Sequence, residues 1–393
     1  MTQKSAERLW TRDFVLLTTA LFLISTAFYF LLPTLPIYVV EELGASNREV
    51  GLIVAVYTLA ALMIRPFAGI ALDLWGRRII LIISSLFFAI VFLGYPWMTL
   101  IVSLLMLRFL HGLNWGISTS AVFTLVVDIV PQKKRGRGLG YAGLAFNMAM
   151  AIGPVIGLLL MGEGRYDALF YGALALAVLG SGVFFLVRYP AFEKSETLKF
   201  SWKGLIAKRS VPVTMNVLLV MLTFGGVITF LTLYAEELDL SAFTGLYFTI
   251  MAVGMGLARV FGGQIFDRFG PRIIVLAGIV HAAAGFVLLS MMPYCSCFIA
   301  SSFFIGAGLG ILIPSFQSMA NNMVNKERRG VANSTFLTGL DLGIGLGSIL
   351  SGFLADLVSL SFSYLFSVGI IIMSLILFFG KTLPHYRKYA IFE

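Results

Sequence analysis

Four charged residues stand inside long apolar runs of this sequence: Arg65, Arg108, Arg259 and Asp341. A charge on an apolar helix at membrane depth is costly, so such a residue usually faces a partner or an aqueous path. Burial raises the pKa of a carboxyl group such as that of Asp341, whereas a nearby arginine lowers it. His111, on the same helix as Arg108, adds a group that titrates near neutral pH. These residues are therefore candidates for an internal ion pair or an aqueous path, and His111 for a proton relay.

The segments that carry these residues are long and apolar. Of the 393 residues, 59% are hydrophobic and only 12% are charged, whereas a soluble domain is about a quarter charged. Apolar runs between charged breaks predict twelve helices long enough to cross a hydrocarbon core of about 30 Å. We place them near 14–38, 48–73, 79–96, 98–128, 138–161, 166–188, 211–235, 242–267, 272–292, 295–323, 331–357 and 359–380. The sequence therefore predicts an all-α integral membrane protein.

The distribution of lysine and arginine predicts the orientation of these helices. If the N-terminus is inside, most of the 28 basic residues lie in cytoplasmic segments, and the outer loops keep only Arg48 and Arg165. Basic residues concentrate on the cytoplasmic side of membrane proteins. We therefore expect a multi-pass protein of the cell membrane with both termini in the cytoplasm. The net charge of +9 then reflects topology, and no nucleic-acid partner is expected.

The two halves of the chain repeat one pattern at a constant offset. The stretch "RPFAGIALDLWGRR" (65–78) recurs as "RVFGGQIFDRFGPR" (259–272). We expect a six-helix bundle over 1–189, a cytoplasmic linker over 190–210 and a second six-helix bundle over 211–393. Parallel repeats of this kind place a binding site near the midplane, where the two halves meet.

At this point the chain resembles a twelve-helix transporter of the major facilitator superfamily over essentially its full length. The residues that match the family's loop motif between helices 2 and 3 are Gly69, Asp73, Gly76, Arg77 and Arg78, with a looser second copy at Gly263, Asp267, Gly270 and Arg272. The resemblance implies two pseudo-symmetric bundles and a conformational latch, in which Asp73 meets the N-terminus of helix 11 in the outward-facing state. Gly69 would allow close helix approach, and Gly76 a tight turn. The alternative is that the motif only fixes topology, which would not explain Asp73.

Three partial matches favour the drug:proton antiporter branch of this family. They are Pro33 and Pro36 in helix 1, Arg108 with His111 in place of a glutamine in helix 4, and Gly153, Pro154 and Gly157 of the antiporter motif in helix 5. The resemblance implies that Arg108 takes part in proton coupling or in binding anionic groups. His111 is either a proton relay or a packed core residue.

The second half differs from the first at one titratable position. Asp341 is expected about 15 Å into helix 11, and its symmetry mate is Asn147. We hypothesise an Arg65–Asp341 pair that protonation of Asp341 weakens, and a fixed structural pair is the alternative. Small residues recur every fourth position on helices 5 and 11, and we expect these stripes to contact helices 8 and 2. The residues expected to line the substrate cavity are Tyr29, Tyr57, Asn114, Asn147, Tyr234, Arg259 and Gln317.

The leading functional hypothesis is proton-coupled export of a small amphipathic molecule by alternating access. The alternatives are a proton-coupled importer of a sugar or organic anion, and a lipid or lysolipid translocator in which Arg65 and Arg259 hold a headgroup. The sequence has no nucleotide-binding loop of the G-x-x-x-x-G-K-[ST] type and no nucleophile–base pair, so we expect no enzyme. We expect no metal or cofactor, and a functional monomer whose partners are its substrate, protons and the lipid bilayer.

Overall fold

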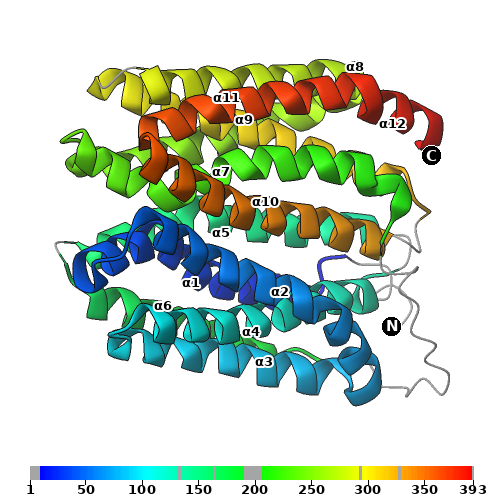
Figure 1. The fold of residues 1–393 in the computed structure, drawn as a ribbon. Helices are drawn as coiled ribbons and strands as arrows, with labels where there is room; N and C mark the ends of the chain where they lie inside the picture. Colours follow the sequence, from blue (N-terminus) through cyan, green and yellow to red (C-terminus); the bar gives the residue numbers. More distant parts are fainter. Residues whose placement is uncertain are drawn as a thin grey trace. The chain divides into compact units, whose positions relative to one another are not determined.

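Helices account for nearly all of the computed structural model, which describes residues 9–131, 134–162, 164–189, 206–291, 294–325 and 329–391. They are α1 (Arg12–Leu43), α2 (Asn47–Trp75), α3 (Arg77–Val91), η1 (Phe92–Trp97), α4 (Ile101–Ile129), α5 (Arg135–Met161), α6 (Tyr166–Phe185), η4 (Lys208–Ser210), α7 (Val211–Glu237), η5 (Ser241–Phe243), α8 (Thr244–Met291), α9 (Cys295–Asn322), α10 (Arg329–Leu357), α11 (Leu360–Leu377), η7 (Phe378–Thr382) and α12 (Leu383–Tyr389) (Figure 1). Within this described part, twelve segments are long and apolar enough to cross a membrane. The predicted all-α membrane fold is confirmed.

The two copies of the repeated motif share one backbone turn. Gly270 has φ 74° and ψ 177°, which interrupts α8 (Thr244–Met291) with one non-helical residue. Gly76 has φ 86° at the start of α3. A positive φ is open to glycine at little steric cost but rarely to other residues. Each glycine therefore lets a spanning helix end and the next one begin within a single residue.

Contacts divide the chain into two compact units. The first consists of Met1–Leu31 and Leu59–Leu205, and the second of Leu32–Thr58 and Ile206–Glu393. The end of α1 and the start of α2 thus group with the second unit. The boundaries at residues 189 and 210 stay a prediction, and residues 190–205 of the expected linker lie outside the described residues.

Small residues set the closest helix packing inside each unit. In the first unit, a Cβ on Gly153 or Gly157 of α5 would meet Tyr29 or the backbone of Phe30 on α1. In the second unit, Gly339, Gly343 and Gly347 of α10 back onto Thr214, Leu218 and Leu222 of α7. Small residues allow this approach in membranes, where helix packing depends on van der Waals contact. The stripe glycines named here face α1 and α7. Contact of the predicted helix 11, which is α10, with helix 2 is present at other residues, since a Cβ on Gly345 of α10 would meet Thr58 of α2. Contact of helix 5 with helix 8 stays a prediction.

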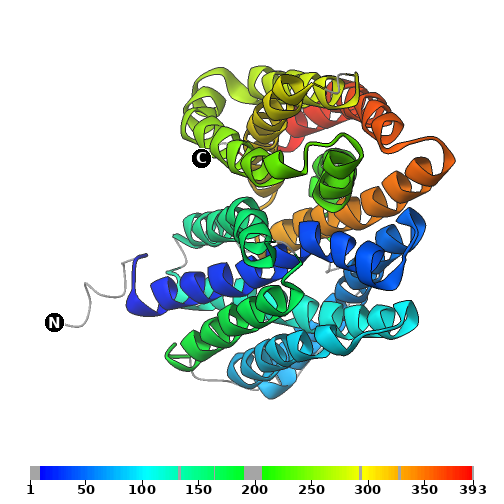
Figure 2. The same ribbon diagram turned by 90° about the vertical axis from the view of Figure 1, so that its left-hand side faces the viewer.

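The first unit also holds a group of three helices in close contact. Helix α3 packs against α4 and α6, as the cyan and green ribbons show (Figure 2). This packing matters for function because η1, which continues α3, brings its own side chains over α4.

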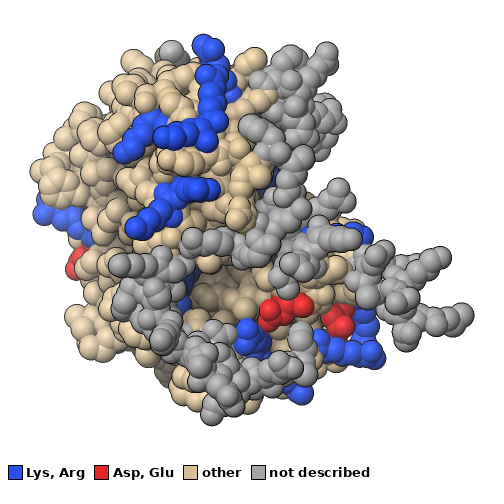
Figure 3. Space-filling view, turned by 90° about the vertical axis from the view of Figure 1, so that its right-hand side faces the viewer, with Lys and Arg blue, Asp and Glu red and all other residues tan. Residues whose placement is uncertain are grey.

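Exposed basic side chains gather where α12 ends. Lys208, Arg209, Lys381, Arg387 and Lys388 are all exposed, and Figure 3 shows separate clusters of lysine and arginine on this face. The η4 segment is tied to α12 by His385, whose Nε2 lies 3.0 Å from the carbonyl oxygen of Arg209. Basic residues are typical of the cytoplasmic side of membrane proteins, and the cytoplasmic position of the C-terminus stays a prediction.

Candidate functional site

A wholly buried polar network joins helix α4 to the turn η1 in the first unit. Arg108, His111 and Tyr95 have no exposed surface. Nη1 of Arg108 donates a hydrogen bond to the Tyr95 hydroxyl oxygen at 3.3 Å, and that oxygen lies 2.9 Å from Nδ1 of His111. The hydroxyl can accept from one neighbour and donate to the other. Tyr95 therefore links the two ionisable residues that the sequence singled out on α4.

Aromatic rings surround this network. The His111 ring lies 4.4 Å from the Phe88 ring and 4.7 Å from the Phe92 ring, centroid to centroid. The Tyr95 ring stacks on Phe170 of α6 at 5.2 Å. Polar groups interact strongly in such an apolar environment, and leaving one unpaired there is costly. Arg108 and His111 are thus buried in an aromatic core, with Tyr95 as a polar neighbour of both.

Sequence reasoning missed Tyr95. It belongs to η1, at the end of the predicted helix 79–96, where an aromatic residue is typical of a membrane interface. Only its spacing after the buried Phe88 and Phe92 could have suggested an inward orientation.

The second unit holds the remaining titratable candidate. Asp341 lies on α10 and is partly buried. Arg65 lies on the part of α2 that belongs to the first unit, and it is also partly buried. The Arg65–Asp341 pair stays a prediction.

The surroundings of the polar residues predicted to line a cavity differ from one residue to the next. Tyr29, Tyr57 and Tyr234 are 4% exposed or less, and the Tyr234 hydroxyl donates to the carbonyl of Leu289 at 3.0 Å. Nδ2 of Asn114 donates to the carbonyl of Leu110 on its own helix. The side chain of Asn147 lies outside the described part of the structure. For these residues the cavity role stays a prediction.

Gln317 and Arg259, both in the second unit, are polar residues that could bind a ligand. Nε2 of Gln317 on α9 donates to Oδ1 of Asn333 on α10 at 2.7 Å. Arg259 lies on α8, and its Nε and Nη2 atoms are buried with no hydrogen-bond partner in the described part of the chain. These residues combine positive charge with amide donors, which suits an anionic ligand.

The motif after α2 is held by contacts inside the first unit. Nε of Arg77 pairs with Oδ2 of Asp128 at 3.0 Å, and Arg78 lies 5.8 Å over the Tyr189 ring. In the second copy, Arg272 lies 5.9 Å over the Phe379 ring. A Cβ on Gly69 would meet no described atom within 4 Å, and close helix approach at this glycine stays a prediction.

The latch itself falls largely outside what the structure describes. The side chains of Asp73 and Asp267 and the surroundings of Gly263 are not among the described features. The latch role of this motif stays a prediction.

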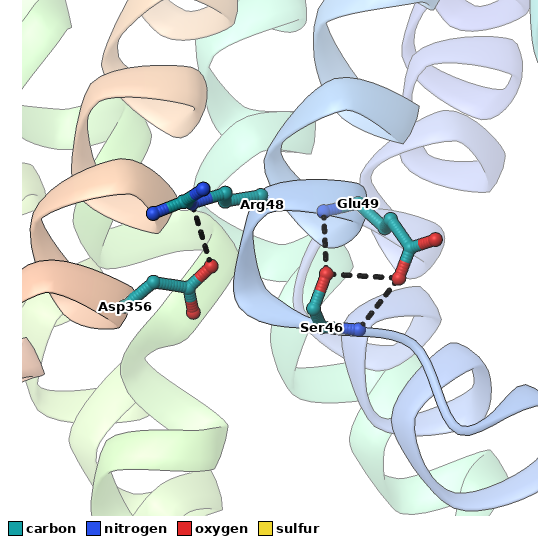
Figure 4. A network of polar contacts seen from close by, with 4 residues as sticks. All are labelled: Ser46, Arg48, Glu49 and Asp356. Carbon is teal, nitrogen blue, oxygen red and sulfur yellow. Dashed lines mark hydrogen bonds and ion pairs between the residues drawn. The ribbon is translucent and has the colours of Figure 1, made fainter.

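An ion pair joins the start of α2 to the end of α10 within the second unit. Nε of Arg48 lies 3.1 Å from Oδ2 of Asp356 (Figure 4), and the guanidinium lies 5.3 Å over the Phe353 ring. Ser46 and Glu49 cap α2 reciprocally, because each side chain bonds to the other residue's backbone N–H. The sequence placed Arg48 in an outer loop but gave no partner for it.

Among the described residues, no group of three or more histidine, cysteine, aspartate or glutamate side chains could hold a metal ion. Cys295 and Cys297 form no disulfide bond and are partly buried.

Comparison with known families now decides the class of protein. A model of the Major Facilitator Superfamily matches residues 17–295 and 242–391. The chain belongs to this family. The predicted resemblance is confirmed, and the protein is a multi-pass membrane transporter of the major facilitator type.

Three curated relatives of this transporter span nearly the same length. An uncharacterized MFS-type transporter, MJ1560, of Methanocaldococcus jannaschii is 26% identical and covers 86% of this chain and 90% of the relative. The staphylopine export protein of Staphylococcus aureus is 25% identical, over 87% and 89%. The quinolone resistance protein NorA of the same species is 26% identical, over 86% and 88%.

Solved structures share the fold of this transporter. The nucleoside transporter NupG superposes with a TM-score of 0.73 at 16% identity, covering 96% of this chain and 100% of NupG. The human organic anion transporter MFSD10 superposes with a TM-score of 0.73 at 15% identity, over 93% and 98%. At such low identity these likenesses show the fold alone.

Proposed function

We propose that this major facilitator transporter exports a small amphipathic molecule in exchange for protons, by alternating access in the cell membrane. The observation that carries the proposal is the buried Arg108–Tyr95–His111 network. Ionisable groups inside a membrane are energetically costly, and helix packing alone does not require them. Their presence therefore supports a role in proton coupling. The relative named as a staphylopine export protein supports export as the direction.

In this proposal the two units carry different parts of the coupling. Asp341 takes up the proton in the second unit, and its pairing with Arg65 changes when it does. Arg108 and His111 respond in the first unit. Because Tyr95 bonds to both, a proton gained by His111 and a movement of Arg108 cannot occur independently. The protein works as a monomer, without a cofactor and without catalysing a covalent reaction, and both of its termini lie in the cytoplasm.

The test uses purified protein in liposomes with an imposed pH gradient. Uptake of cationic, zwitterionic and anionic amphipathic compounds is compared among wild type, Asp341→Asn and a control, Asp239→Asn. Asp239 is exposed in the loop after α7, and asparagine tolerates its positive φ of 56°. Both variants therefore make the same chemical change, one at bilayer depth and one at the surface.

Wild type and Asp239→Asn should move a compound against the proton flow. Asp341→Asn should lose this response to the gradient while it still exchanges the compound without one. Transport in the same direction as the protons would make the protein an importer and refute export by antiport. Gradient-driven transport that is unchanged in Asp341→Asn would remove Asp341 from the coupling step.

A further inference from the structure

Arg259 carries two buried hydrogen-bond donors for which the described residues supply no acceptor. Its Nε and Nη2 atoms are buried and donate to none of the described residues, and no carboxylate of the described chain pairs with it. A buried charged donor without a partner loses its hydration and gains nothing in return. An anion that bound there would recover this cost.

The packing register places Arg259 between two helices of the second unit. A Cβ on Gly306 of α9 would meet the backbone of Met251 on α8, and a Cβ on Gly310 would meet that of Met255. Both helices advance by four residues between these contacts, so they run in the same direction. The next step along α8 is Arg259, which therefore lies on the face that α8 turns toward α9.

Other unpaired polar atoms lie at this end of α9 and α10. Asn333 is 1% exposed, and its Oδ1 accepts from Gln317 while its Nδ2 has no partner in the described chain. Oδ1 of Asn321, one turn after Gln317, is likewise buried without a partner. Nε and Nη2 of Arg259 and Nδ2 of Asn333 are hydrogen-bond donors, whereas Oδ1 of Asn321 is an acceptor. The group thus has more donors than acceptors and carries one positive charge. This combination suits an oxyanion, which accepts several hydrogen bonds, and not a cation.

We propose that Arg259 binds the anionic group of the transported molecule, a carboxylate or phosphate, between α8 and α9, with the Asn333 amide as a further donor. The inference rests on the proposed function, since it assumes a transported amphipathic molecule. It narrows the substrate class to amphipathic anions and zwitterions. The guanidinium fork can hold two oxyanion oxygens at once, which a lysine ammonium cannot do.

The test measures binding to the whole protein in phosphatidylcholine nanodiscs. The probes are 2-naphthoate and 2-naphthamide, which share one apolar body and differ in charge. Their apparent Kd values are compared for wild type, Arg259→Gln, Arg259→Lys and a control, Arg165→Gln, which removes an exposed arginine of a loop in the first unit. Size-exclusion profiles show whether each variant is folded.

Wild type and Arg165→Gln should bind the naphthoate about ten- to a hundredfold more tightly than the amide, the range for a hydrogen bond to a charged group. Arg259→Gln should lose this preference, and Arg259→Lys should keep part of it. If the glutamine variant fails to fold, the reduced preference of the lysine variant still tests the inference. Equal binding of both probes by wild type, or an unchanged preference in Arg259→Gln, would overturn the inference. Loss of the preference in wild type when phosphatidylglycerol is added would assign the site to a lipid headgroup and equally overturn it.

These results are separable from the proposed function. Proton-driven export of cations without any carboxylate preference would leave the function standing and refute the role of Arg259. A carboxylate preference that depends on Arg259, without any response to a pH gradient, would do the reverse.

Discussion

Replacing Tyr95 by phenylalanine removes one oxygen atom from the centre of the buried network. The ring and its stacking on Phe170 remain, so the change isolates the two contacts to Arg108 and His111. Hydrogen bonds in membrane proteins average about 0.6 kcal/mol each, and one to a charged group such as Arg108 contributes about 1.5–3 kcal/mol. We expect Tyr95→Phe to lower the free energy of unfolding by about 1–3 kcal/mol.

The assay is reversible unfolding in mixed micelles by titration with sodium dodecyl sulfate, and the matched control is Tyr364→Phe. Tyr364 is also wholly buried, but its hydroxyl has no hydrogen-bond partner among the described residues. Removing that hydroxyl should be neutral or stabilising, because an unpaired buried polar group is unfavourable. The reasoning is refuted if Tyr95→Phe is as stable as wild type, or if Tyr364→Phe loses as much stability.

Two further predictions concern helix contacts. Gly347→Ala should destabilise the second unit by about 1–3 kcal/mol, because a Cβ there would meet the backbone of Leu222. The control is Gly369→Ala, where a Cβ would meet no described atom within 4 Å. This variant should be as stable as wild type, or more stable by up to about 1 kcal/mol, because alanine has the higher helix propensity. The folded fraction after heating compares the two, and equal losses would contradict the packing account. A double-mutant cycle of Arg48→Gln and Asp356→Asn should give a coupling free energy of about 0–1 kcal/mol that weakens with salt, since the Arg48 side chain is 56% exposed. A coupling well above this range that does not depend on salt would contradict the prediction.

The spanning helices and their turns could be predicted from the sequence because each depends on local composition. An apolar run of membrane length must be helical to satisfy its backbone, so the predicted spans follow the observed ones closely. Gly76 and Gly270 mark the turns because both take a positive φ, which other residues rarely adopt.

Contacts between helices could not be predicted in the same way. Arg108 and His111 were recognisable as ionisable residues on one helix, but their link through Tyr95 depends on how η1 lies over α4. The pair between Arg48 and Asp356 depends likewise on the rotation of α2 and α10 about their axes. A helix exposes several residues at each level, and the sequence does not say which one a neighbour meets. For the same reason the glycine stripes were recognised, but the sequence did not show that their glycines face α1 and α7.

In the proposed function, protons and substrate cross the membrane in opposite directions. The pH inside liposomes during substrate efflux measures this exchange most directly. Vesicles that contain the transporter and a pH-sensitive dye are loaded with a transported compound and diluted into compound-free buffer at equal pH. As the compound leaves, the account predicts that the lumen becomes acidic in wild type and in Asp239→Asn, and that the pH hardly changes in Asp341→Asn. A lumen that becomes alkaline, or one that does not change although the compound leaves wild-type vesicles, would contradict proton antiport.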